Sequence, residues 1–272
     1  MTHTSNNLQI LHFDTIGQWS VQTPTSAFYK TGFHPFNLTL SLPNQISKVK
    51  KIYLKSVELP VGFTNIRDTN TSNLLSMSIA NIYANKSYNF NILLPNKNYT
   101  SIQALLTDIN DAIAANPTVQ DNLDYIAPPY FTVSGQKVSI NVSGLVTFSF
   151  NDTILSKYIL GFSWNFYIFT GSSYEAASNY NIVYDTYIIM NFPKLSATST
   201  GANQQISFKI PYNATYNQIY FDYENTSFSQ FVELTDNNAV IGNLQMTIND
   251  RFGNIINNNG LDFSFSLAFL TD

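Results

Sequence analysis

Apolar and polar residues alternate along residues 243–249, which is the period of a strand with one buried side. The apolar positions are Leu244, Met246 and Ile248. The positions between them are polar but uncharged: Asn243, Gln245, Thr247 and Asn249. The pattern therefore predicts a half-buried strand, and it raises the question of what lies against a polar side that carries no charge.

The same alternation returns at residues 261–269. Its apolar row consists of Leu261, Phe263, Phe265, Leu267 and Phe269, and its second row of Asp262, Ser264, Ser266 and Ala268. The sequence between the two stretches, "NDRFGNIINNNG", is rich in Asn, Asp and Gly, which tolerate the backbone angles of turns. We expect two antiparallel strands that close the chain.

Strand signals also follow one another closely from residue 36, each bounded by Pro, Asn or Gly clusters. The candidates are residues 36–42, 48–60, 74–83, 88–94, 137–142, 145–150, 181–192, 204–210 and 217–223. Within residues 48–60, Ile52 and Leu54 lie on one side, whereas Val57 and Leu59 lie on the other. This change of phase near Lys55 predicts a β-bulge, or a strand buried on both sides midway.

One segment has helical rather than strand periodicity. Apolar residues recur at helical spacing at Ile102, Leu105, Leu106, Ile109 and Ile113. Thr100 and Gln103 have the spacing of a capping box, and Asn116 with Pro117 forms a plausible stop. The residues alone therefore predict an all-β, antiparallel β-sandwich with one amphipathic helix at about 100–115.

Residues 1–35, with no sustained period, are expected to form an N-terminal arm or edge segment.

Composition narrows the class of protein. Charged residues make up 11% of the 272 residues and aromatic residues 15%, whereas an average soluble domain has roughly 25% charged residues. A chain with so many aromatic residues is not expected to be disordered. The net charge of −4 and the presence of only two arginines argue against direct nucleic-acid binding.

The chain has no cysteine, which excludes disulfides, thiol nucleophiles and thiolate metal sites. Its first residues show neither the basic region nor the apolar run of a signal peptide. The most apolar run, residues 158–169, is about half as long as a membrane-spanning helix of roughly twenty residues. We expect no signal peptide and no transmembrane segment.

Candidate chemistry is sparse, and we expect no enzyme, catalytic residue, cofactor or metal. His12 and Asp14 would share one side of a strand, as would Asp222 and Glu224, but neighbouring ionisable groups on a solvated strand are common. His3 and His34 lie too far away in sequence for a spaced metal motif.

Three weaker features remain open. Calcium could be held by residues 249–260, or by Asp121 and Asp124, although neither has the EF-hand spacing. The basic cluster of Lys48, Lys50, Lys51 and Lys55 could meet an acidic partner or an anionic membrane, but it fits a solvated strand edge better. The aromatic run that contains Trp164 and Phe166 could be core, a subunit contact or a sugar-binding platform.

Three segments, in this order, resemble the pattern of penton and minor capsid proteins of virophages, polinton-like viruses and nucleocytoplasmic large DNA viruses. They are "KKIYLKSVELPVGFTNI", then "LLPNKNYTSIQALLTDIN" followed by "YILGF", then "IGNLQMTINDRFGNIINNNGLDFSFSLAF". Leu160–Phe162 and Asp250–Gly253 match as structural positions. Each segment alone is a weak signal, and their order carries the resemblance.

The resemblance implies a jelly-roll β-sandwich that forms pentamers at the five-fold vertices of the icosahedral shell of a double-stranded DNA virus. It implies no catalytic residue. Residues 36–272 would be the jelly-roll capsid domain, with a β insertion or second small β domain around 161–204. The expected partners are copies of the chain and capsomers of the major capsid protein. The protein would be made in the host cytoplasm or a viral factory and reside in the virion.

In such a shell, uncharged strand sides would lie against neighbouring subunits or an overlying segment, where amides and hydroxyls can pair and a buried charge would be costly. The interface residues predicted on this hypothesis are Asn243, Gln245, Ser264, Ser266, Trp164 and Phe166. Two alternative functions remain: a minor capsid protein that cements larger capsomers, and a carbohydrate-binding β-sandwich for host attachment.

Overall fold

The computed structural model describes residues 7–14, 37–81, 86–120, 126–142, 146–163, 167–169, 173–199, 202–211, 219–223, 231–234, 239–258 and 261–271. The chain divides into two compact units. Unit 1 comprises Met1–Phe63 and Asp185–Asp272, and unit 2 comprises Thr64–Tyr184. The two ends of the sequence therefore build one unit, and the middle of the sequence builds the other.

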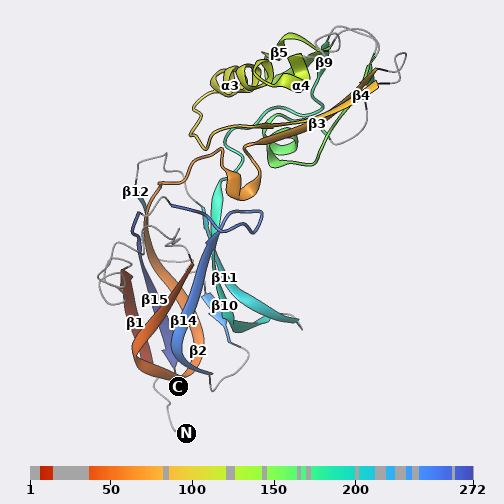
Figure 1. Ribbon diagram of the computed structural model, residues 1–272. Coiled ribbons are helices and arrows are strands. Elements are labelled where there is room, and N and C mark those ends of the chain that lie inside the picture. The colour runs from red at the N-terminus through yellow and green to blue at the C-terminus, as the bar shows by residue number, and fades with distance from the viewer. Residues whose placement is uncertain are drawn as a thin grey trace. The chain divides into compact units, whose positions relative to one another are not determined.

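Unit 1 is an antiparallel jelly-roll β-sandwich (Figure 1). Its described strands are β1 (Asn7–Asp14), β2 (Asn37–Pro60), β10 (Tyr187–Ser199), β11 (Ala202–Pro211), β12 (Ile219–Tyr223), β13 (Phe231–Glu233), β14 (Ala239–Asn249) and β15 (Ser264–Thr271). The hydrogen-bonded order is β1-β15-β2-β14-β10-β11, with β12 and β13 also paired to β2. All these pairs are antiparallel.

The long strand β2 belongs to both layers of the sandwich. Its first half, up to Val49, pairs with β14, whereas its second half pairs with β15 on one side and with β12 and β13 on the other. Lys48 lies at the change of partner and has a left-handed backbone with φ of 56°. The pairing with β14 also shifts register between Ile46 and Val49. Such irregularities bend a strand, which lets β2 pass from one layer to the other.

The bulge that the sequence predicts in β2 is confirmed. Ser56 lies opposite Ser266 and Leu54 lies opposite Leu267, so Lys55 is an extra residue of β2 between two consecutive register pairs with β15. The extra residue reverses the alternation. As a result Ile52 and Leu54 on one side of the bulge, and Val57 and Leu59 on the other, are all buried.

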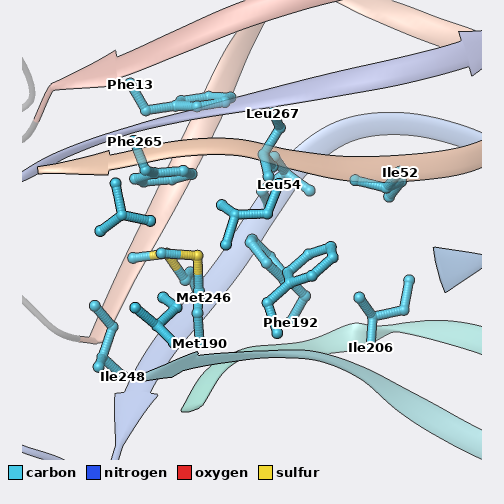
Figure 2. Close-up of a cluster of buried hydrophobic side chains, with 14 of the residues drawn as sticks. Phe13, Ile52, Leu54, Met190, Phe192, Ile206, Met246, Ile248, Phe265 and Leu267 are labelled. Atoms are coloured by element: carbon cyan, nitrogen blue, oxygen red, sulfur yellow. The ribbon is translucent and has the colours of Figure 1, made fainter. Parts of the chain in front are cut away.

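The core of unit 1 lies between the two layers. Figure 2 shows side chains from β1, β2 and β15, such as Phe13, Leu54 and Phe265, facing side chains from β10, β11 and β14. The facing set includes Met190, Phe192, Ile206, Met246 and Ile248. Phe265 stacks on Phe13 with ring centroids 4.8 Å apart. The apolar rows predicted for the last two strands thus point into this core, except for Leu261, which is exposed.

Both strands that the sequence predicts at the end of the chain are present, and each is antiparallel to β2. The described partners of β14 are β2 and β10, and those of β15 are β1 and β2. The two strands therefore pair with different halves of β2 instead of with each other. Sequence periodicity gives the buried side of each strand, but it does not give the partner.

The turn after β14 is held by a buried carboxylate. Asp250 is fully buried, and its Oδ1 accepts hydrogen bonds from the backbone N–H groups of Phe252 (2.9 Å) and Asn254 (3.0 Å). Gly253 follows with a φ of 91°, a conformation that other residues rarely adopt. This is the "DRFG" segment, so here a turn requires both the Asp and the Gly.

Unit 2 contains two small sheets and the helices found among the described residues. Its elements are η1 (Asp68–Asn70), β3 (Leu74–Asn81), β4 (Lys86–Leu93), α3 (Ile102–Ala114), α4 (Pro117–Gln120), β5 (Ile126–Ser134), β6 (Lys137–Val142), β7 (Val146–Phe150), the π-helix η2 (Leu155–Ile159), β8 (Tyr167–Phe169) and β9 (Ser173–Glu175). One sheet has the order β4-β3-β7-β8 and the other β5-β6-β9.

The predicted amphipathic helix is confirmed as α3, and the predicted apolar positions are its buried residues. The capping residue differs by one position. Ser101 rather than Thr100 is the N-cap, and its Oγ accepts a hydrogen bond from the backbone N–H of Ala104 (3.2 Å). The helix ends at Ala114, before the expected stop at Asn116 and Pro117, and the short helix α4 begins at that proline.

Unit 2 also differs from the expected insertion in extent. An insertion was expected around residues 161–204, whereas unit 2 starts at Thr64 and ends at Tyr184. It includes α3, so it is a mixed α and β unit and not a small β domain. Residues 187–199 instead form β10, a strand of the sandwich. Because strands of both units have the same periodicity, the pattern gave no boundary at residue 64.

Candidate interaction surface

The outer surface of one layer of unit 1 is formed by β1, β15, the second half of β2 and β13, and we call it the β15 face. Cross-strand pairing places its outward side chains in four rows. The rows are Leu8, Leu270, Lys51 and Glu233; then Ile10, Ala268, Tyr53 and Phe231; then His12, Ser266 and Ser56; and last Asp14, Ser264 and Glu58. The face thus changes from apolar at one end to polar at the other.

The uncharged residues of the first two rows form what we call the apolar stripe: Leu8, Ile10, Tyr53, Phe231, Ala268 and Leu270. Three of these side chains are about half exposed, Leu8 at 52%, Ile10 at 50% and Phe231 at 50%. Ala268 is completely buried in the middle of its row, between Ile10 and Tyr53. The rings of Tyr53 and Phe231 lie 5.5 Å apart, so the row is continuous across four strands.

Lysines border the stripe and are held in place. Lys51 Nζ lies 2.5 Å from Glu233 Oε1 and 4.8 Å from the centroid of the Phe231 ring. The hydrogen bond with Glu233 raises the pKa of Lys51 above its usual value. Lys55, the bulge residue, places its Nζ 5.4 Å from the centroid of Tyr53. The basic cluster of the sequence therefore splits, with these two lysines beside the aromatic rings of the stripe.

Next to the stripe, three side chains form a hydrogen-bonded chain. Ser56 Oγ donates to Ser266 Oγ at 2.8 Å, and Ser266 Oγ lies 2.6 Å from His12 Nδ1. An imidazole with its proton on Nε2 accepts the Ser266 proton at Nδ1. Hydroxyl and imidazole side by side are the raw material of nucleophilic catalysis. Here, however, Ser266 is only 4% exposed, so its oxygen is shielded from a substrate. The three hydrogen-bonded side chains instead join β1, β15 and β2.

The opposite layer of unit 1 presents a different outer surface, which we call the amide face. It is built by the first half of β2 together with β14, β10 and β11. Its outward side chains include Thr39, Asn191, Ser207, Asn243, Gln245 and Thr247. Each of these is a hydroxyl or an amide, and Lys209 of β11 lies at one end, 4.1 Å above the ring of Tyr187.

One buried amide organises part of that face. Asn249 is 7% exposed, and its Oδ1 accepts hydrogen bonds from Asn191 Nδ2 and Thr247 Oγ1, both at 2.8 Å. Its Nδ2 donates to the carbonyl oxygen of Gly253 at 2.7 Å. Asn249 therefore joins β10, β14 and the turn that follows, whereas Asn243 is exposed.

The predicted interface residues fall on two faces. Asn243 and Gln245 lie together on the amide face, and Ser264 and Ser266 lie in neighbouring rows of the β15 face. Ser264 is half-buried, but Ser266 is covered within the protomer by its bonds to His12 and Ser56. Ser266 is therefore covered by its own protomer, and its contact with a neighbouring subunit stays a prediction. Trp164 and Phe166 lie outside the described residues.

The other chemical candidates gain little from the structure. His12 and Asp14 do share one side of β1. The side chain of Asp222 and all of Glu224 lie outside the described residues, as do His3, His34, Asp121 and Asp124. Asp250 uses its carboxylate in the turn. Across the described ranges, no three acidic or His side chains gather in a group that could hold a metal ion.

Sequence reasoning missed the apolar stripe. A signal was present in "NLQILHFD", where Leu8 and Ile10 alternate on one side while Leu11 and Phe13 occupy the other. An eight-residue strand that is apolar on both sides indicates either burial of both sides or an exposed contact surface. Tyr53 and Phe231 join it only through pairing between strands distant in sequence.

Unit 2 contains a second polar cluster. Tyr99 donates its hydroxyl proton to Asp108 Oδ2 (2.6 Å), and Lys97 Nζ lies 2.8 Å from the same oxygen. Burial and the bond to Asp108 raise the pKa of Tyr99, and the bonds from Lys97 and Tyr99 lower the pKa of Asp108. The cluster ties the segment before α3 to the helix. Its three ionisable side chains bond to one another, with Asp108 accepting from both Tyr99 and Lys97.

Comparison with known proteins finds a likeness among solved structures but none among family models or curated sequences. The crystal structure of the selenomethionine-labelled mavirus penton protein aligns with 98% of this chain and 99% of its own, with a TM-score of 0.45 and 11% identity. At that score and identity the likeness carries no argument about function. Among the described residues, no helix has the length and apolar character needed to cross a membrane.

Proposed function

We propose that this chain is a structural virion protein, and specifically the penton protein at the five-fold vertices of an icosahedral capsid. Its partners would be four further copies in a pentamer and the surrounding capsomers of the major capsid protein, and its location the virion. A structural role requires surfaces that fit other subunits and no catalytic centre.

The observation that carries the proposal is where the family-like segments lie in the fold. The first segment forms the second half of β2, and the last forms β14, the Asp250 turn and β15. The middle segments form most of α3 and the end of η2 in unit 2. The residues that resemble capsid proteins thus contribute buried side chains to both units.

The two outer faces of unit 1 support assembly into a ring. A closed ring of identical subunits needs two different surfaces on each subunit that match each other. Unit 1 has two outer faces of different chemistry, the β15 face and the amide face. Burying the amide face at an interface costs little free energy, because neutral amides and hydroxyls can pair across the interface without burying a charge.

The test is the position of the protein in purified particles. A map of the virion at moderate resolution should show unit 1 and unit 2 as density around the five-fold axes. Native mass measurement of the purified chain should give a closed pentamer. A monomer or trimer that maps between larger capsomers would instead identify a cement protein, and absence of the chain from particles would contradict a structural role altogether.

A further inference from the structure

Three side chains of the apolar stripe of the β15 face lie outside the hydrophobic core of unit 1. These exposed side chains, Leu8, Ile10 and Phe231, point away from the core that Phe13, Leu11 and Val232 of the same strands enter. We propose that the stripe binds a second copy of this chain. The inference rests on the proposed function, since it assigns one contact surface of the shell subunit.

The size of the stripe suits a protein partner. Three large side chains that are each about half exposed leave on the order of 300 Å² of apolar surface in one place. A specific interface buries about 800 Å² per partner, with an apolar centre and a polar rim. The stripe has the composition of such a centre, and the His12, Ser266 and Ser56 row and the charged residues beside it have that of the rim.

The stripe is also rigid before it binds. All six of its residues lie on hydrogen-bonded strands. Lys51 is held over the Phe231 ring by Glu233, and Lys55 lies over Tyr53. Little side-chain freedom is therefore lost on docking, and this loss is one of the main costs of association.

The charges on the face favour a second copy over other macromolecules. Lys51 and Lys55 are accompanied by Glu58, Glu233 and Asp14 on the same outer surface. A nucleic acid or an anionic membrane would meet these carboxylates and be repelled. A second copy carries both signs of charge, so it presents no single-sign field to either the lysines or the carboxylates.

The first experiment measures self-association of the full chain by sedimentation velocity over a wide range of concentration. Ile10→Asp and Phe231→Asp should each weaken association roughly tenfold or more, because each places a charge in the centre of the contact. Leu93→Asp is the matched control, since Leu93 is 69% exposed but belongs to unit 2. Circular dichroism and thermal melting should show that all three variants are folded.

A second experiment leaves the contact intact. The chain has no cysteine, so Ile10→Cys and Leu93→Cys each introduce a single thiol. Maleimide labelling of the Ile10→Cys protein should be slow at concentrations where the chain is associated and fast after dilution. Labelling of the Leu93→Cys protein should not depend on concentration.

The outcomes separate this inference from the proposed function. Association that is unchanged in both stripe variants, or a wild-type chain that stays monomeric, would overturn the self-contact even if the protein is found at particle vertices. Association that is lost only in the stripe variants would support it even if the protein is absent from particles. Binding of the wild type to anionic vesicles, abolished by Phe231→Asp without any self-association, would show that the occupant is a membrane.

Discussion

The two outer faces of unit 1 cover the same core but treat their polar groups differently. On the β15 face, the hydroxyl of Ser266 is buried in a chain with Ser56 and His12, and apolar side chains are left exposed. On the amide face, most of the exposed or half-buried groups of the paired strands are amides and hydroxyls such as Asn243 and Gln245. Uncharged side chains on the outer side of a strand can thus be either buried within the protomer or exposed to solvent.

The difference follows from the position of the strand in its sheet. β15 lies between β1 and β2, where Ile10 and Tyr53 flank Ala268, and Ser266 is hydrogen-bonded to His12 and Ser56. On β14 the neighbouring outward side chains are themselves short polar groups, such as Thr39 and Asn191, and Gln245 remains partly exposed. Large or hydrogen-bonded neighbours thus bury a small residue, whereas Gln245 beside a short neighbour stays partly accessible.

The largest effect should come from the core that both faces share. Phe265 is 2% exposed and stacks on Phe13 and on Phe263 at 4.8 and 6.0 Å. Phe265→Ala should lower the free energy of unfolding of unit 1 by about 3–5 kcal/mol, because it leaves a cavity between the layers. Urea unfolding measures the loss. Hydrogen exchange should accelerate in β10 and β14 but not in β3 of unit 2, and protection retained in β14 would contradict a shared core.

A charge introduced on each face should show, through the loss of stability, which residue is buried and which is exposed. Ser266→Asp should reduce the free energy of unfolding by about 2 kcal/mol or more, because the carboxylate replaces a hydroxyl that is 4% exposed. Asn243→Asp should change it by less than about 0.5 kcal/mol, since Asn243 is exposed. Thermal and urea unfolding of the two variants, with wild type, give the comparison. Equal effects would show that the two faces do not differ in this way.

Within the amide face, Asn249 should matter and Asn243 should not. Asn249→Ala removes the hydrogen bonds with Asn191, Thr247 and Gly253, and we expect a loss of about 1–2 kcal/mol. Asn243→Ala is the control, with an expected change near zero. Urea unfolding measures both. A loss no larger for Asn249→Ala than for the control would mean that the amide network contributes nothing to the fold.

The smallest effect belongs to unit 2. The folded pKa of Asp108 is lowered by Lys97 and Tyr99, so its contribution is present above the pKa of the unfolded chain and is lost as the pH falls through the folded pKa. Asp108→Asn should cost less than about 1 kcal/mol at neutral pH, because the pair with Lys97 is solvent-screened. The variant should also lose less stability than wild type between neutral and acidic pH, as measured by urea unfolding. Identical pH profiles would exclude the cluster as an acid-sensitive contact.

Several local features could be predicted from particular residues. The bulge at Lys55 followed from a change of phase, and the buried positions of α3 and of β14 followed from periods of 3.6 and 2. The N-cap was missed by one position because Thr100 and Ser101 are both good capping residues, and only the backbone decides between them. These features depend on neighbours within one element.

The candidate surface could be predicted only in part. The neutral residues Asn243 and Ser264 were found from the alternation, but the burial of Ser266 depends on His12, which is 254 positions away in sequence. Similarly, the stripe joins Ile10, Tyr53 and Phe231 through pairing across three strand boundaries. No local pattern contains such a contact.

By itself the sequence determined that the chain is rich in half-buried strands, where its main helix lies and which side of each terminal strand faces a core. These properties arise from the covalent geometry of the backbone and from the hydrophobic effect acting on successive residues. Only the tertiary structure decided that residues 1–63 and 185–272 form one unit, that β2 serves both layers and that apolar side chains from four strands meet on an outer face. Strand pairing decides these, because hydrogen bonds between backbones are the same for every partner and the choice depends on packing across the whole unit.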